Sequence, residues 1–157
     1  MNTVFRIRQR VYWEDTDAGG VVYYANYRRF LERARSDWLR QLGLNQEALR
    51  HQAGWIFVVS HVDARYLKPA RLDDLIDISA GLHQLDRASL VCGQQIHRDG
   101  ELLLLAAGEV AAAPKAGVDL LRGAVDRQEE EVQPASDQRL DVDRQREVGR
   151  HAGVQQI

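Results

Sequence analysis

A carboxylate and two glycines stand directly before a long helical pattern, within residues 15–27. Asp17 precedes Gly19 and Gly20, and the apolar repeat that predicts a helix begins near Tyr23. The free N–H groups at the start of a helix attract developing negative charge. A carboxylate that faces them can attack a carbonyl carbon or activate a water beside it, while the N–H groups hold the oxyanion. Because glycines also let a substrate approach the backbone, this pattern suits acyl transfer without a metal or cofactor.

The same residues also fit a purely structural role. Asp15, Thr16 and Asp17 can form Asx turns or cap the following helix, and the glycines can simply turn the chain. Carboxylates that cap helices are common, so spacing alone favours this structural role. Spacing alone also identifies no substrate.

The elements around this segment follow from hydrophobic periodicity. Residues 4–13 alternate between apolar and polar side chains, which predicts a half-buried strand. Apolar side chains then recur every three or four residues from about 23 to 42, which predicts one long helix. Residues 45–52 fit a short second helix with Asn45 as its N-cap. Four strand-like segments follow, at residues 55–64, 74–85, 89–98 and 101–113.

The order of these elements predicts the fold class. The last two strand-like segments flank Asp99-Gly100, a two-residue hairpin signal. A strand, a long helix and then four strands favour an α+β fold, with an antiparallel sheet on one helix. A doubly wound nucleotide-binding fold requires helices between successive strands, and the sequence does not show them.

Composition excludes several classes of protein. With 157 residues and a net charge of -2, the chain suits one domain and lacks the basic character of nucleic-acid binding. The longest apolar run, Leu102–Ala107, is too short to span a bilayer, and the N-terminus lacks the apolar stretch of a signal peptide. The single cysteine, Cys92, suits a small core residue in a reducing compartment, so we expect a cytoplasmic protein. The histidines show no paired spacing for a metal, and we predict no metal site.

The segment around Asp17 resembles a known family. It is similar to the hotdog-fold acyl-CoA thioesterases of the 4-hydroxybenzoyl-CoA thioesterase family, and most closely to their Tol-Pal-associated, YbgC-like branch. The resemblance is nearly continuous over Arg10–Tyr27, and it covers about residues 4–105. It is also carried by Glu32-Arg33-Ala34-Arg35, Pro69-Ala70-Arg71-Leu72-Asp73-Asp74 and Arg87-Ala88-Ser89-Leu90-Val91. A fixed string of this length is specific, so with it the catalytic interpretation outweighs the structural one.

The resemblance implies a fold, an activity and a site. The fold is an antiparallel sheet wrapped around one long helix, and the activity is hydrolysis of an acyl-CoA to free acid and coenzyme A, with no cofactor. Asp17 takes the catalytic role, either as nucleophile or as general base, and the backbone N–H of Tyr24 takes the oxyanion. Members of this branch often carry His where this chain has Tyr24, so an imidazole contribution is not expected here, whereas a backbone donor is unaffected.

The resemblance also implies how substrate and partner are bound. Trp13 is expected to line the acyl pocket, with Gly19 and Gly20 against the substrate, and Arg87 and Ser89 are expected to meet coenzyme A. Arg87 equally fits a solvated surface charge. Members are homodimers or homotetramers with sites at subunit interfaces, and an acyl carrier protein is a further candidate partner. The resemblance does not fix acyl length, nor coenzyme A against acyl-carrier-protein thioesters.

The C-terminal third has a different composition. All aromatic residues lie between Phe5 and Tyr66, and the resemblance fades after Leu105. We therefore predict a thioesterase domain over residues 1–105 and an atypical tail over 106–157, either disordered or produced by a frameshift in a GC-rich gene. Translating the gene in its other two frames past codon 105 tests the frameshift. The tail also supports an alternative function, a non-catalytic or damaged hotdog protein that acts as an acyl-carrier or envelope-associated binding partner.

Overall fold

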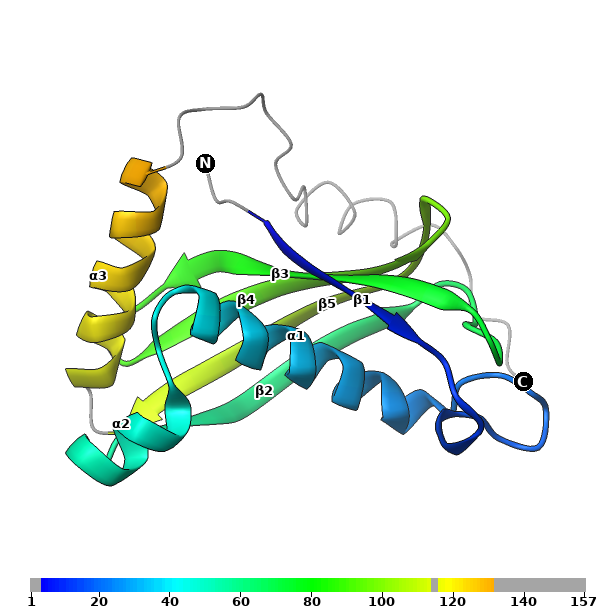
Figure 1. Ribbon diagram of the computed structural model, residues 1–157, viewed down its shortest axis with the longest axis horizontal. Helices are drawn as coiled ribbons and strands as arrows, with labels where there is room; N and C mark the ends of the chain where they lie inside the picture. Colours follow the sequence, from blue (N-terminus) through cyan, green and yellow to red (C-terminus); the bar gives the residue numbers. More distant parts are fainter. Residues whose placement is uncertain (1–3, 114–115, 132–157) are drawn as a thin grey trace.

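The computed structural model describes residues 4–113 and 116–131 (Figure 1). Its strands form one antiparallel sheet in the order β1-β3-β4-β5-β2. The strands are β1 (Phe5–Arg10), β2 (Ile56–Tyr66), β3 (Leu75–Leu85), β4 (Ser89–Arg98) and β5 (Glu101–Ala113). The helices are α1 (Tyr27–Gln41), α2 (Gln46–Ala53) and α3 (Ala116–Glu131), with 3₁₀ turns η1 (Trp13–Asp15) and η2 (Tyr24–Asn26).

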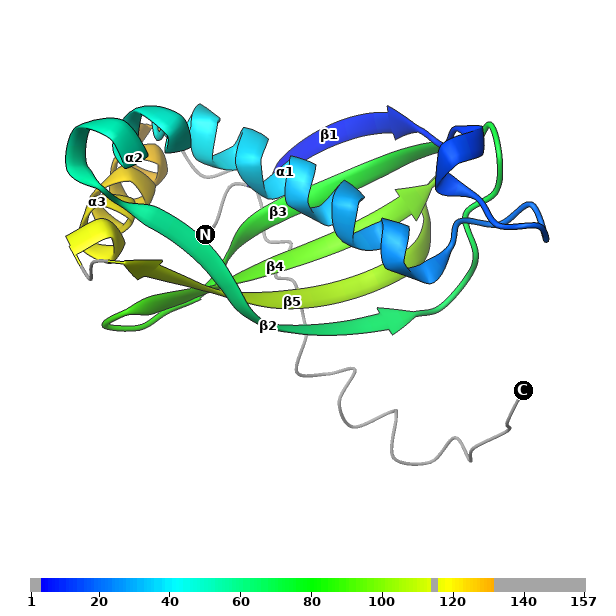
Figure 2. The same cartoon turned by 90° about the horizontal axis from the view of Figure 1, so that it is seen from below.

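The sheet curves around α1, which lies along one of its faces (Figure 2). The apolar side of α1 is buried against the sheet and recurs at the predicted spacing of three and four residues. This arrangement confirms the prediction of an α+β fold with an antiparallel sheet wrapped around one long helix. The buried residues of α1 are Tyr27, Phe30, Leu31, Ala34, Trp38 and Leu39.

The helix begins later than its apolar pattern suggested. Tyr23 is extended, with φ -60° and ψ 130°, because its N–H donates to the carbonyl of Asp15 at 3.0 Å. The chain then makes the single turn η2 before α1 begins at Tyr27. The predicted short helix is confirmed as α2, where the side chain of Asn45 accepts the N–H of Ala48 at 3.0 Å.

The hairpin between β4 and β5 is the one that the sequence indicated. Asp99 and Gly100 have φ values of 49° and 82°. Positive values at both positions are those of a type I′ turn, in which Asp-Gly is favoured. The bounds of both strands coincide with the predicted segments.

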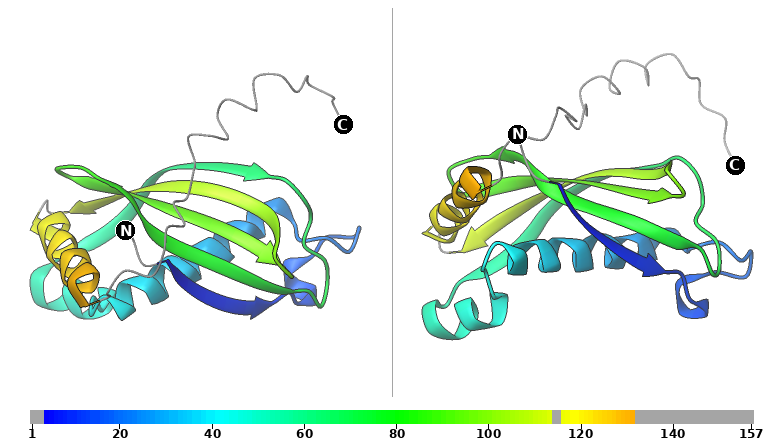
Figure 3. Two further views of the ribbon diagram at one scale, coloured as in Figure 1. Left: turned by 90° about the horizontal axis from the view of Figure 1, so that it is seen from above. Right: turned by 45° about the horizontal axis from the view of Figure 1, so that its top comes forward.

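Ordered structure continues past residue 105, where the sequence placed the end of the domain. Strand β5 runs on to Ala113, with Gly108 paired to Cys92 of β4 and to Val62 of β2. Helix α3 then packs its apolar side against the end of the sheet (Figure 3). The buried residues of α3 include Val118, Leu121, Ala124 and Val125. The boundary at 105 thus falls inside β5.

Helix α3 packs with few large side chains of its own because the rings of Trp55 and Phe57 face its small residue Gly117. A Cβ atom on Gly117 would lie 3.0 Å from the Cβ of Ala112 and 3.8 Å from the ring of Trp55. The predicted disorder concerns in part residues 132–157, which lie outside the described residues. The frameshift stays a prediction. No helix within residues 4–113 and 116–131 is long and apolar enough to cross a membrane.

Candidate active site

Asp17 lies in a small, tightly bonded turn. Its N–H donates to the carbonyl of Val21 at 2.9 Å, and the N–H of Gly20 donates to the Asp17 carbonyl at 3.0 Å. The N–H of Gly19 donates to Oδ1 of Asp17 at 2.8 Å. The side chain is exposed, and within the described part of the chain its Oδ2 atom has no hydrogen bond. One carboxylate oxygen is therefore held by the backbone and the other faces outward.

Each of the two glycines in this turn is required for a different structural reason. A Cβ atom on Gly19 would lie 3.1 Å from Oδ1 of Asp17, closer than most such contacts, so a side chain there would disturb the carboxylate. Gly20 has a φ of 72°, in the left-handed region that other residues rarely adopt. Both glycines thus serve the geometry of Asp17 itself, and their contact with substrate stays a prediction.

The neighbouring carboxylate, Asp15, has a structural role. It is buried, with 3% of its surface exposed, and its Oδ2 accepts the N–H of Tyr12 at 2.8 Å. Its carbonyl accepts the N–H of Tyr23 at 3.0 Å and the side-chain amide of Asn26 at 3.0 Å. Of the two acidic groups, Asp17 alone is free to act on a ligand, and Asp15 fastens the turn to the start of α1.

Tyr24 presents an open backbone donor near this turn. It is the first residue of η2, and no acceptor for its N–H occurs within residues 4–113 and 116–131. Unpaired N–H groups at a helix start favour negative charge. The carbonyl of Tyr24 accepts the hydroxyl of Tyr66 at 3.2 Å, which anchors the peptide that follows. This N–H can hold an oxyanion, in the same loop that carries the free carboxylate of Asp17.

Tyr66 contacts the candidate oxyanion residue Tyr24, and the sequence did not single it out. Its ring lies edge-on to Tyr24 and Tyr27, with centroid distances of 6.4 and 5.5 Å. Tyr66 ends β2, 42 residues from Tyr24, and no motif marks it. Trp13 lies in η1 and is 76% exposed, so little of the described part of the chain covers its ring. Its predicted place in an acyl pocket therefore requires a further wall.

Arg87 and Ser89 lie far from Asp17 in this chain. Arg87 lies in the turn between β3 and β4 and Ser89 begins β4, next to α3, where the carbonyl of Asp86 accepts a hydrogen bond from Arg122 at 3.5 Å. Strand β3 begins beside the Asp17 turn and has 11 residues, so its far end is about 35 Å away. Figure 1 shows the two ends on opposite sides of the molecule. The structure thus brings together Trp13, Asp17, Gly19, Gly20 and Tyr24, but not Arg87 and Ser89.

Other chemistry-bearing groups do not extend this site. Cys92 is buried, and burial raises the pKa of its thiol to about 11, so it carries no thiolate at neutral pH. Within the described ranges, no cluster of His, Cys, Asp and Glu could hold a metal ion.

A hollow of about 540 Å³ lies between α1 and β2, lined in part by Arg28, Leu31 and Val62.

The curved sheet around one helix, with its exposed carboxylate beside the helix start, defines a hotdog-fold protein of the thioesterase class. Residues 11–127 match the model of the thioesterase-like superfamily, and the chain belongs to this superfamily. The matched range extends beyond residue 105.

Named relatives agree with this assignment. The acyl-CoA thioester hydrolase YbgC of Escherichia coli O6:H1 is 47% identical over 94 residues, which are 60% of this chain and 69% of that protein. The acyl-CoA thioesterase YbgC of Haemophilus influenzae is 39% identical over 107 residues, 68% of this chain and 79% of that protein. A probable thioesterase from Bartonella henselae superposes with a TM-score of 0.69 at 34% identity, covering 73% of this chain and 95% of that one.

Proposed function

We propose that this chain hydrolyses acyl-CoA thioesters to free acid and coenzyme A through Asp17. The observation that carries the proposal is the free Oδ2 of Asp17 in the same β1–α1 loop as the open N–H of Tyr24, in a chain of the thioesterase-like superfamily. The YbgC relatives are named as acyl-CoA thioesterases, which supports the same substrate class.

Two routes fit this geometry. In the first, Oδ2 of Asp17 bonds to the thioester carbon, and the carbon–sulfur bond breaks to release coenzyme A as a thiolate. Water then hydrolyses the mixed anhydride, which frees the acid and the Asp17 carboxylate and supplies the proton that the thiolate takes up. In the second, Asp17 takes a proton from water, the water oxygen attacks the carbon, and the proton passes on to the leaving sulfur. In both routes the N–H of Tyr24 stabilises the oxyanion, and one water is consumed for each coenzyme A released.

We infer that the working unit is a homodimer or a dimer of dimers. Strand β2 lies at an edge of the sheet, and its apolar side chains Ile56, Val58 and Val59 are each at least 40% exposed. Free apolar edges of this kind pair readily with another strand. A second copy at this edge would cover the hollow beside α1, add a wall near Trp13, and could bring its own Arg87 toward the Asp17 turn.

The substrate would be a coenzyme A thioester, with an acyl carrier protein as alternative carrier, and the protein would act in the cytoplasm. An association with the Tol-Pal system is supported by the YbgC-like resemblance alone.

A thiol-release assay tests the activity with short, long and aromatic acyl-CoAs. Asp17→Asn keeps the shape of the side chain and the hydrogen bond from Gly19, but removes the charge. We expect kcat to fall by at least about 100-fold, as for loss of a general base or nucleophile. Asp37→Asn, on the exposed side of α1 in an ion pair with Arg40, is the matched control and should retain activity within twofold.

The same assay decides against the competing candidate, a non-catalytic binding protein. If the unaltered protein releases no more thiol than Asp17→Asn with any substrate, the enzyme proposal is wrong and the binding role is favoured.

A further inference from the structure

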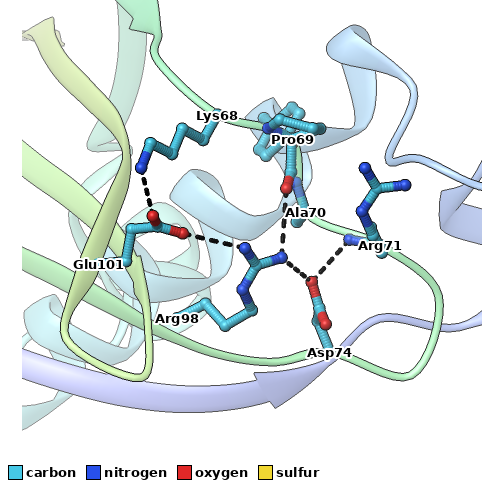
Figure 4. A network of polar contacts seen from close by, with 8 residues as sticks. Lys68, Pro69, Ala70, Arg71, Asp74, Arg98 and Glu101 are labelled. Atoms are coloured by element: carbon cyan, nitrogen blue, oxygen red, sulfur yellow. Dashed lines mark hydrogen bonds and ion pairs between the residues drawn. The ribbon is translucent and has the colours of Figure 1, made fainter.

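Arg98, at the end of β4, forms hydrogen bonds with the segment 69–74, which leads into β3 (Figure 4). One terminal nitrogen of Arg98 donates to Oδ2 of Asp74 at 2.7 Å and to the carbonyl of Pro69 at 3.4 Å. The other donates to Oε2 of Glu101 at 3.0 Å. The side chain is only 24% exposed. Arg98 therefore ties two points of the segment 69–74 to the β4–β5 hairpin.

The acidic partners of Arg98 are themselves held in place. Oδ2 of Asp74 also accepts the N–H of Arg71 at 2.7 Å, which closes the turn at residues 71–74. Lys68 forms an ion pair with Glu101 on the outer side of the network. Lys68 and Arg98 together hold the pKa of Glu101 below its usual range, so Glu101 stays charged at neutral pH.

The other side of the segment 69–74 touches the Asp17 turn. The carbonyl of Ala70 accepts the N–H of Val22 at 2.8 Å, and the N–H of Leu72 donates to the carbonyl of Gly20 at 3.3 Å. The N–H of Ala70 donates to the hydroxyl of Tyr27, the first residue of α1, at 2.8 Å. A short chain of hydrogen bonds thus runs from Arg98 through this segment to the turn and to the helix start.

The segment needs this support because its backbone is strained. Asp73 has a φ of 67°, in the left-handed region that residues with a side chain rarely occupy. Such conformations persist only where surrounding contacts impose them. The guanidinium of Arg10 donates to the Asp73 carbonyl at 2.8 Å, so a second arginine holds the same turn.

We propose that Arg98 is a positioning residue for the active site, acting through the segment 69–74 to fix the Asp17 turn against the start of α1. This inference rests on the proposed thioesterase function. Arginine suits the role because its planar fork can reach several acceptors at once, whereas lysine presents a single point charge. A displacement of about 1 Å at reacting groups can lower a rate by about 100-fold, so loose support appears in kcat.

The first test compares two arginine–aspartate pairs of the same sheet. Arg98→Met removes the donors and keeps much of the apolar stem. Arg8→Met is the matched control, because Arg8 pairs with Asp77 at 2.7 and 3.0 Å on β1 and β3 without touching the segment or the turn. We expect Arg98→Met to lower kcat at least tenfold with KM within twofold, and Arg8→Met to leave both within twofold. A kcat for Arg98→Met within twofold of the control overturns the proposal.

Two further variants separate positioning from general stability. Asp74→Asn should lower kcat at least fivefold, and the double variant Arg98→Met/Asp74→Asn should be no slower than Arg98→Met alone, since both act through one contact. Arg98→Lys should recover part of the lost kcat. Effects that multiply in the double variant, or a Lys variant as slow as Met, contradict the proposal even if Arg98→Met folds poorly.

Amide hydrogen exchange tests the inference without using activity. Loss of Arg98 should speed exchange at the N–H groups of Val22 and Leu72 at least tenfold, while Arg8→Met should not. Unchanged exchange in Arg98→Met overturns the positioning role, whatever the assay shows. If exchange is faster in Arg98→Met but hydrolysis does not depend on Asp17, Arg98 still positions the segment 69–74, and the proposed thioesterase function is wrong.

Discussion

The two ends of the sheet are held together by different interactions. At the end that carries Asp17, hydrogen bonds and ion pairs join the loops, as in the contacts of Val22 with Ala70 and of Arg98 with Asp74. At the opposite end, α3 packs by burying apolar side chains such as Leu121. Large rings are exposed at the first end, whereas apolar side chains are buried at the second.

This difference separates accuracy of placement from stability. A typical hydrogen bond adds only about 0.5–1.5 kcal/mol to folding, but it fixes direction and distance. A buried leucine contributes about 2–5 kcal/mol and fixes orientation much less. We therefore expect single substitutions at the Asp17 end to change rates more than stability, and substitutions at the α3 end to do the reverse.

The largest effect on stability is expected at Leu121. Leu121→Ala removes a fully buried side chain of α3 and should lower the free energy of unfolding by about 2–5 kcal/mol. The kcat of the folded protein should stay within twofold, because α3 does not touch the Asp17 turn. Denaturant unfolding and steady-state kinetics measure the two quantities.

The control for this prediction is Asp126→Ala on the exposed side of α3, which should change the free energy of unfolding by less than about 0.5 kcal/mol. If the two variants are equally stable, α3 contributes nothing to the fold. That result would agree with a C-terminal segment foreign to the domain.

A smaller effect is expected at Arg87 and would connect the two ends across a dimer. If a second copy brings this residue to the bound coenzyme A, Arg87→Ala removes a charge-assisted contact to phosphate worth about 1 kcal/mol, so KM should rise about fivefold with kcat unchanged. The corresponding pantetheine thioester lacks the nucleotide phosphates, so its KM should not change.

The control is Arg50→Ala, which also removes one positive charge, from an exposed ion pair with Glu47 on α2. It should leave the KM for acyl-CoA unchanged. An unchanged KM for acyl-CoA in Arg87→Ala, or an equal rise for the pantetheine thioester, would contradict a contact between Arg87 and the nucleotide.

The sequence was informative wherever the signal is local. The spacing of Phe30, Ala34 and Trp38 predicts the buried side of α1, and Asp99-Gly100 predicts the β4–β5 hairpin. Asp17 became a candidate because its glycines and the expected helix start lie within a few residues of it, and the resemblance over Arg10–Tyr27 then favoured the catalytic interpretation. Period and turn chemistry act over short distances along the chain, so a single sequence contains them.

Contacts between distant segments were not predictable in this way. Tyr66 contacts Tyr24 because β2 ends near the start of α1, and Arg98 contacts the segment 69–74 because β4 ends beside it; neither residue lies in a motif. Helix α3 was missed because small residues such as Gly117 and Ala124 give a weak apolar stripe, while the large rings that face it come from β2 and its approach. Such packing depends on the partner surface and not on local composition.

The smallest predicted effect concerns the hydroxyl of Tyr66. Tyr66→Phe removes the donor to the Tyr24 carbonyl but keeps the edge-on ring contacts with Tyr24 and Tyr27. This hydrogen bond is long, at 3.2 Å, and the side chain is half exposed, so about 0.5 kcal/mol and a twofold loss of kcat are expected.

Tyr66→Leu removes the ring as well, and comparison with Tyr66→Phe measures what the aromatic contacts add to placing the helix start. If both variants keep full kcat, the peptide after Tyr24 needs no anchor from β2. Support of the oxyanion donor would then come from inside the loop, through Asp15 and Asn26, and the polar end of the sheet would be fixed by fewer contacts than its geometry suggests.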